Sequence, residues 1–112
     1  MEKLIKYQQI LTEFLEEYAK IKYANIQDLE QQIIIDKDRN HFQLVSIGWL
    51  KDQFVHDTVF HFDIKDDKIW IQQNWTDIKL SKELIARGVN PEDIIVGFIP
   101  NPAPIYGLSK AI

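Results

Sequence analysis

Residues 61–98 have the sequence HFDIKDDKIWIQQNWTDIKLSKELIARGVNPEDIIVGF, and this stretch decides the fold. Short apolar segments flank the polar turn at 65–68, a pattern that predicts a β-hairpin. Residues 80–85, LSKELI, then place apolar side chains at helical spacing, and Gly88 is suited to end that helix because glycine enters the left-handed region without penalty. Residues 90–99, NPEDIIVGFI, predict one proline-started helical turn followed by a buried strand.

Outward from this stretch, the N-terminal segment predicts an amphipathic helix. Apolar residues from Leu4 to Ile21 fall on one side at about 100° per residue, and Ile5 is the exception on the polar side. β-branched and aromatic segments with short turns between them predict four strands, at Gln31–Asp36, His41–Leu50, Phe54–Ile64 and Lys68–Gln73. The fold class is therefore α+β, with an N-terminal helix, a four-stranded antiparallel meander, a second helix and a final strand.

Composition limits what the protein can be. Its 112 residues predict a single domain spanning 1–112, and the absence of cysteine excludes disulfides and thiol chemistry. The net charge of −4 argues against a nonspecific DNA-binding protein, whose affinity comes from basic residues. No signal peptide or membrane span is visible, so we expect a cytoplasmic protein. Three prolines between Pro100 and Pro104 argue against regular structure there.

Histidines and carboxylates supply the only candidate metal ligands. Strict alternation along the third strand would place Asp57, His61 and Asp63 on one face, and would separate His56 from His61. A solvated or subunit-facing sheet surface explains the same pattern and is favoured over a metal site. Residues 36–40, DKDRN, resemble the start of a calcium loop but lack its glycine and its final glutamate, so a turn is favoured.

Nothing in the sequence matches a catalytic motif. The four glycines form neither a phosphate-binding loop nor a dinucleotide fingerprint, and no serine has a nucleophile signature. We therefore expect no catalytic residues, no metal and no cofactor. Aromatic residues exceed what one core requires, and Trp70 falls on the opposite strand face from Ile69 and Ile71. Because tryptophan is enriched at interface hot spots, Trp70 and Trp75 are candidate partner-binding residues.

Four stretches resemble the XisI family, the fdxN-element excision controlling factors of cyanobacteria. They are LIKYQQILTEFLEEYA (4–19), DKDRNHFQLVSIGW (36–49), HFDIKDDKIWIQ (61–72) and KELIARGVNPEDIIVGF (82–98). The resemblance keeps its order over nearly the whole chain. It departs at NWTDIKLS (74–81) and at the ending NPAPIYGLSKAI (101–112), which has no arginine before Tyr106. If these stretches set partner choice, Tyr106 joins the candidate partner-binding residues.

The resemblance implies a role in controlling excision of a DNA element by a site-specific recombinase. It also implies action together with an XisH-like protein of nuclease fold, and it carries over no catalytic residue. We therefore expect a non-enzymatic controlling factor that binds an XisH-like partner and itself. The alternatives are an inhibitor of the partner nuclease and a DNA-binding regulator that uses Lys65, Lys68, Lys79 and Lys82. A hydrolase built on Asp57, His61 and Asp63 is the least favoured hypothesis.

Overall fold

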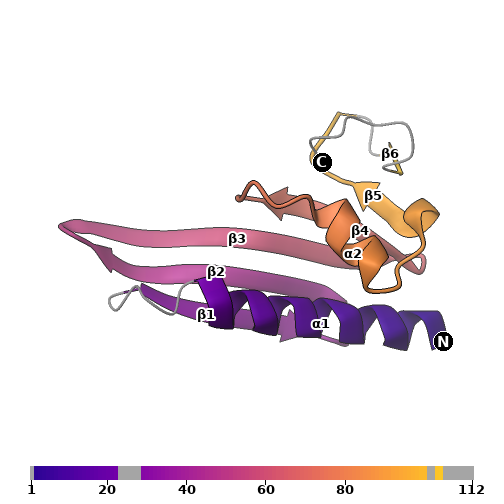
Figure 1. Cartoon of the computed structure of the whole chain (residues 1–112), viewed down its shortest axis with the longest axis horizontal. Helices are drawn as coiled ribbons and strands as arrows, with labels where there is room; N and C mark the ends of the chain where they lie inside the picture. The colour runs from indigo at the N-terminus through magenta and orange to yellow at the C-terminus, as the bar shows by residue number, and fades with distance from the viewer. Residues whose placement is uncertain (1, 23–28, 101–102, 105–112) are drawn as a thin grey trace.

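The structure, a computed structural model, describes residues 2–22, 29–100 and 103–104 (Figure 1). Its elements in chain order are α1 (Glu2–Lys22), β1 (Leu29–Asp36), β2 (His41–Leu50), β3 (Gln53–Lys65), β4 (Lys68–Asn74), α2 (Leu80–Ala86), the 3₁₀ turn η1 (Pro91–Asp93), β5 (Ile94–Val96) and β6 (Ala103–Pro104). The predicted α+β order is confirmed. Within these residues no helix is both long and apolar enough to span a bilayer.

The six strands lie side by side in the order of the sequence. Strands β1 to β4 form the predicted antiparallel meander, and β5 lies parallel to β4. The sheet is therefore mixed, because α2 carries the chain back before β5 begins. β6 pairs antiparallel to β5, which corrects the expectation that the prolines exclude regular structure up to Pro104. An edge strand tolerates proline because its outer side needs no backbone donor.

Both helices pack on the same side of the sheet and enclose one core (Figure 1). The buried face of α1 includes Tyr7, Leu11 and Leu15, and α2 contributes Leu80 and Leu84. These side chains meet aromatic and aliphatic residues that point from one face of the strands, among them Phe42, Phe60, Phe62 and Ile71. Ile5 is 61% exposed, as its position on the polar side of the helix predicts.

Gly88 ends α2 in the way that the sequence predicts. Its φ is +111°, and the backbone N–H groups of Gly88 and Val89 donate to the carbonyls of Ile85 and Leu84 at 3.0 Å. These bonds satisfy carbonyls that a helix end otherwise leaves without partners. Arg87, the residue before it, forms a two-pronged ion pair with Glu17 of α1, at 3.0 and 3.1 Å. The end of α2 is thereby attached to α1.

A bulge in β3 changes the faces that the sequence predicts. Leu44 pairs with Phe60, but the next residue, Val45, pairs with Thr58, so the pairing skips Val59. The carbonyl of Val59 instead accepts a 2.8 Å hydrogen bond from the backbone N–H of Trp75. β2 pairs with β1 without interruption, so the extra residue belongs to β3. Strict alternation along β3 is therefore wrong across this point, and residues on its two sides exchange faces.

Candidate functional site on the open face of the sheet

The two helices leave the opposite side of the sheet to a mixed set of polar and aromatic side chains, which we call the open face. Cross-strand partners share a face, so the pairs His41–Asp63, Gln43–His61 and Trp49–Phe54 place these residues there together. Trp70 joins them as the partner of Asp63 on β4. The open face therefore has a polar centre, around Asp63, and an aromatic end, at the tip of the β2–β3 hairpin.

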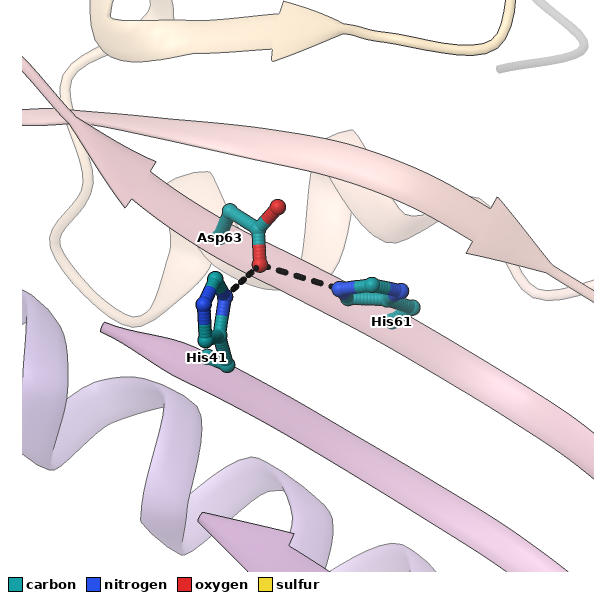
Figure 2. A group of neighbouring side chains, drawn as sticks. All are labelled: His41, His61 and Asp63. Atoms are coloured by element: carbon teal, nitrogen blue, oxygen red, sulfur yellow. Dashed lines mark hydrogen bonds and ion pairs between the residues drawn. The ribbon is translucent and has the colours of Figure 1, made fainter. Parts of the chain in front are cut away.

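Asp63 lies at the centre of a group of converging side chains. Its Oδ1 is 2.7 Å from Nδ1 of His41 and 2.9 Å from Nε2 of His61 (Figure 2). Its Oδ2 accepts a 3.2 Å hydrogen bond from Nε2 of Gln72. Because an ionised carboxylate only accepts hydrogen bonds, both facing imidazole nitrogens carry protons in this arrangement. Three strands, β2, β3 and β4, thus supply the donors to one carboxylate.

The environment of Asp63 favours its charged form. The residue is only 7% exposed, and burial alone would raise the pKa of its carboxyl group. The hydrogen bonds from His41 and His61, with a further one from Gln72, outweigh burial and hold the pKa of Asp63 below its ordinary value. A partly buried carboxylate is therefore ready to accept hydrogen bonds or to bind a cation at neutral pH.

The fold gathers a different set from the one that the sequence predicts. Asp57 pairs with Ser46, whereas His61 pairs with Gln43, three residues away on a regular strand, so Asp57 and His61 point to opposite faces. His56, expected to oppose His61, shares its face for the same reason. His41 was a candidate from the sequence, but its place beside Asp63 was not predicted, because that approach depends on the register between two strands. Turn 37–40 is confirmed as a turn, in which Arg39 binds the Asp36 carboxylate at 3.1 Å.

The three aromatic candidates for partner binding differ in position. Trp70 is half-buried on the open face, with Nζ of Lys65 4.6 Å from its ring centroid. Trp75 is 72% exposed just after β4. It lines a groove of about 350 Å³ together with Gln72, Gln73, Asn74 and Phe98. Tyr106 lies outside the described residues. Of the two candidates that the structure describes, Trp75 is therefore the more exposed.

Three exposed aromatic residues were missed in the sequence, where most aromatics were assigned to the core: Phe98, which follows β5, and a pair beside the β2–β3 turn. Trp49 and Phe54 are 54% and 52% exposed, and their ring centroids are 5.3 Å apart. They flank the turn of the β2–β3 hairpin, which extends past the end of α1 in Figure 1. The predicted turn at 51–53 was a usable signal, because side chains beside a hairpin tip often lack a layer above them.

The four lysines considered for DNA binding do not form one surface. Lys65 and Lys68 pair across the β3–β4 turn. Lys79 precedes α2 and Lys82 lies within it, on the side of the sheet that carries the helices. A phosphate backbone would need several basic residues facing the same way, and these lysines are divided between two sides of the sheet.

Comparison with known proteins gives concordant results. A family model described as XisI protein matches residues 1–104. A crystal structure of an XisI-like protein from Anabaena variabilis ATCC 29413 has 44% sequence identity and a TM-score of 0.80, covering 86% of this chain and 87% of that one. The fdxN element excision controlling factor XisI from the same organism has 26% identity and a TM-score of 0.72, covering 86% of each chain. No curated protein matches. The chain therefore belongs to the XisI family.

Proposed function

We propose that this protein is a non-enzymatic controlling factor for excision of a DNA element, and that it acts by binding an XisH-like partner. Family membership supports the controlling role, because a relative of the same fold is named an fdxN element excision controlling factor. The partner follows from the resemblance of the sequence to this family. The regulation proposed is therefore by contact with another protein rather than by catalysis.

The observation that carries this proposal is the exposure of large aromatic side chains at two places. Trp49 and Phe54 form an edge-to-face pair at the hairpin tip, and Trp75 and Phe98 line the groove beside β4. Each of the four is about half exposed or more. Exposed aromatic residues cost solvation free energy in the isolated chain, and Trp is enriched among residues that dominate binding energy.

Co-purification tests the proposal. The untagged chain is expressed with a tagged XisH-like protein from the same genome, and a complex is expected to survive gel filtration at micromolar concentration. The double variants Trp49→Ala/Phe54→Ala and Trp75→Ala/Phe98→Ala are compared, and at least one is expected to weaken the complex tenfold or more. Ile5→Ala, which removes an equally exposed apolar side chain on α1, is the matched control.

Three outcomes separate the alternatives. Absence of any complex at micromolar concentration contradicts the proposal. Toxicity of the partner expressed alone, relieved by this chain, identifies the controlling factor as an inhibitor of the partner. Binding of the isolated chain to element-border DNA that weakens steeply with salt would favour the DNA-binding alternative. Light scattering of the chain alone tests the expected self-association.

A further inference from the structure

We propose that His41, His61 and Asp63 form a binding site for a divalent transition-metal ion such as Zn²⁺ on the open face. One ligand atom from each residue lies within 4.8 Å of the other two, and all three side chains converge on the same point (Figure 2). Two imidazole nitrogens with one carboxylate oxygen are a donor set that suits Zn²⁺ and its first-row neighbours. The site does not depend on the proposed regulatory function.

The donor atoms converge on Oδ1 of Asp63 and need a local rearrangement to surround an ion. Oδ1 of Asp63 lies 2.7 Å from Nδ1 of His41 and 2.9 Å from Nε2 of His61. Around an ion with ligand bonds of about 2.1 Å, neighbouring donors lie about 3.0 Å apart in octahedral and about 3.4 Å apart in tetrahedral geometry. A metal ion would therefore fit after each imidazole nitrogen moves about 0.1 to 0.7 Å away from Oδ1 and the two nitrogens, which lie within 4.8 Å of each other, close to the same spacing.

The proton balance of binding is simple. Each imidazole nitrogen that faces Asp63 must lose its proton to ligate the ion. In a neutral ring this proton passes through solvent to the other nitrogen, so His41 and His61 bind as neutral ligands. Asp63 binds through its carboxylate oxygen Oδ1, which both imidazole rings already face. At the Asp63 carboxylate, one bond to a divalent ion thus takes the place of two hydrogen bonds from imidazole N–H groups.

The backbone holds the ligands in place before any ion arrives. His41 and Asp63 are direct cross-strand partners in the centre of the sheet, and His61 is two residues from Asp63 on the same face. Gln72, on β4, donates a 3.2 Å hydrogen bond to the carboxylate oxygen that His41 and His61 do not contact. Carboxylate ligands are commonly oriented by hydrogen bonds of this kind, so Gln72 is a positioning residue.

The backbone at Gly97 lies close against the side chain of Gln72. The backbone N–H of Gly97 donates to the carbonyl of Ile71 at 2.9 Å, which brings the chain after β5 against β4. A Cβ atom at position 97 would clash with Oε1 of Gln72. The close approach therefore requires glycine, and the support of the site extends from β2 across to the end of β5.

The remaining coordination positions would face solvent. The His41 side chain is 48% exposed and that of His61 is 29% exposed, while Asp63 lies deeper. Gln72 also lines the groove with Trp75 and Phe98. A bound ion would therefore retain an open position on the surface that borders this groove, where water or a side chain of another protein could complete its coordination.

Calorimetric titration of the untagged full-length chain with Zn²⁺, after treatment with a chelator, tests the site. One equivalent is expected to bind with micromolar or tighter affinity, and Zn²⁺ is expected to raise the melting temperature. His61→Asn and Asp63→Asn should each weaken binding at least a hundredfold. Gln72→Ala should weaken it about 10- to 100-fold while all three ligands remain. His56→Asn, an exposed histidine on the same strand, is the matched control and should change nothing.

A second readout guards against variants that fail to fold. Co²⁺ should give visible absorption bands in the unaltered chain, and these should be lost in His61→Asn but retained in His56→Asn, with circular dichroism checking the fold of both. The proposal is overturned if the unaltered chain binds no Zn²⁺ at micromolar concentration, or if His61→Asn binds as well as the unaltered chain. A loss caused equally by His56→Asn also overturns it, because this would indicate scattered surface histidines. In each of these three cases the residues are a hydrogen-bonded cluster only.

Discussion

The hydroxyl of Tyr7 donates a 2.6 Å hydrogen bond to Oδ2 of Asp93, joining the first turns of α1 to η1 across 86 residues of sequence. Nζ of Lys3 lies 3.0 Å from the same oxygen, and the backbone N–H of Asn90 donates to the Tyr7 hydroxyl at 3.3 Å. Asp93 is buried, so its charge depends on these partners. The contact fixes where β5 begins, since Ile94 follows Asp93 directly.

Tyr7→Phe is expected to destabilise the protein by about 1–3 kcal/mol, because it removes a donor from a buried carboxylate. Urea denaturation measures the change. The double-mutant cycle with Asp93→Asn gives the coupling free energy between the two side chains. Additive effects of the two substitutions would contradict the importance of this hydrogen bond.

Asp93 should also make stability depend on pH in the acid range. Burial opposes its ionisation, but the Tyr7 hydrogen bond and Lys3 outweigh burial and lower the pKa of Asp93. A lowered pKa in the folded state adds stability above the pKa of the unfolded chain, about 3.9, and this stability is lost as pH falls through the folded value. Denaturation between about pH 5 and about pH 2 should therefore show a shallower acid loss in Asp93→Asn. Asp77→Asn, at an exposed aspartate, is the control and should keep the original slope.

Gly97→Ala is expected to destabilise the protein by about 1–3 kcal/mol through overpacking against Gln72. Because the nearest atom is the end of a flexible side chain, shortening that side chain should relieve the clash. The double variant Gly97→Ala/Gln72→Ala should therefore be less destabilised than the sum of the two single variants. Thermal unfolding of all four proteins measures this coupling. An unchanged cost of Gly97→Ala in the Gln72→Ala background would contradict the predicted contact.

Two phenylalanines of β3 should respond very differently to truncation. Phe60 is fully buried against Phe14 and Tyr18, with ring centroids 5.3 and 4.8 Å apart, and Phe60→Ala should cost about 3–5 kcal/mol. Phe54, near the hairpin tip, is 52% exposed, and Phe54→Ala should cost less than about 1.5 kcal/mol. Similar costs for the two substitutions, measured by urea denaturation, would show that the hairpin tip is covered.

The sequence by itself determined the helices, turns and strands that depend on residues close together in the chain. Apolar spacing defined the buried face of α1, and Gly88 ended α2 through its own φ. The helical turn at Pro91 and the antiparallel order of β1 to β4 also followed from short segments and short turns. Each of these depends on residues close together in the chain, so periodicity and turn chemistry were sufficient. Trp75 was named from the sequence only as a candidate for partner binding, because tryptophan is enriched at interfaces; its exposure comes from the structure.

Only the tertiary structure decided the composition of the open face. An unbroken ladder continued from the Leu50–Gln53 pair would set His41 opposite Phe62 and His61 opposite Phe42, so that His61 and Asp63 would lie on the core face. The single extra residue at Val59 moves the pairing by one position, so His41 meets Asp63 instead and His61 turns to the same side. Side chains alternate between faces along a strand, so one bulged residue reassigns every position beyond it. The sequence contains both histidines and the aspartate, but their convergence is a property of the register between strands.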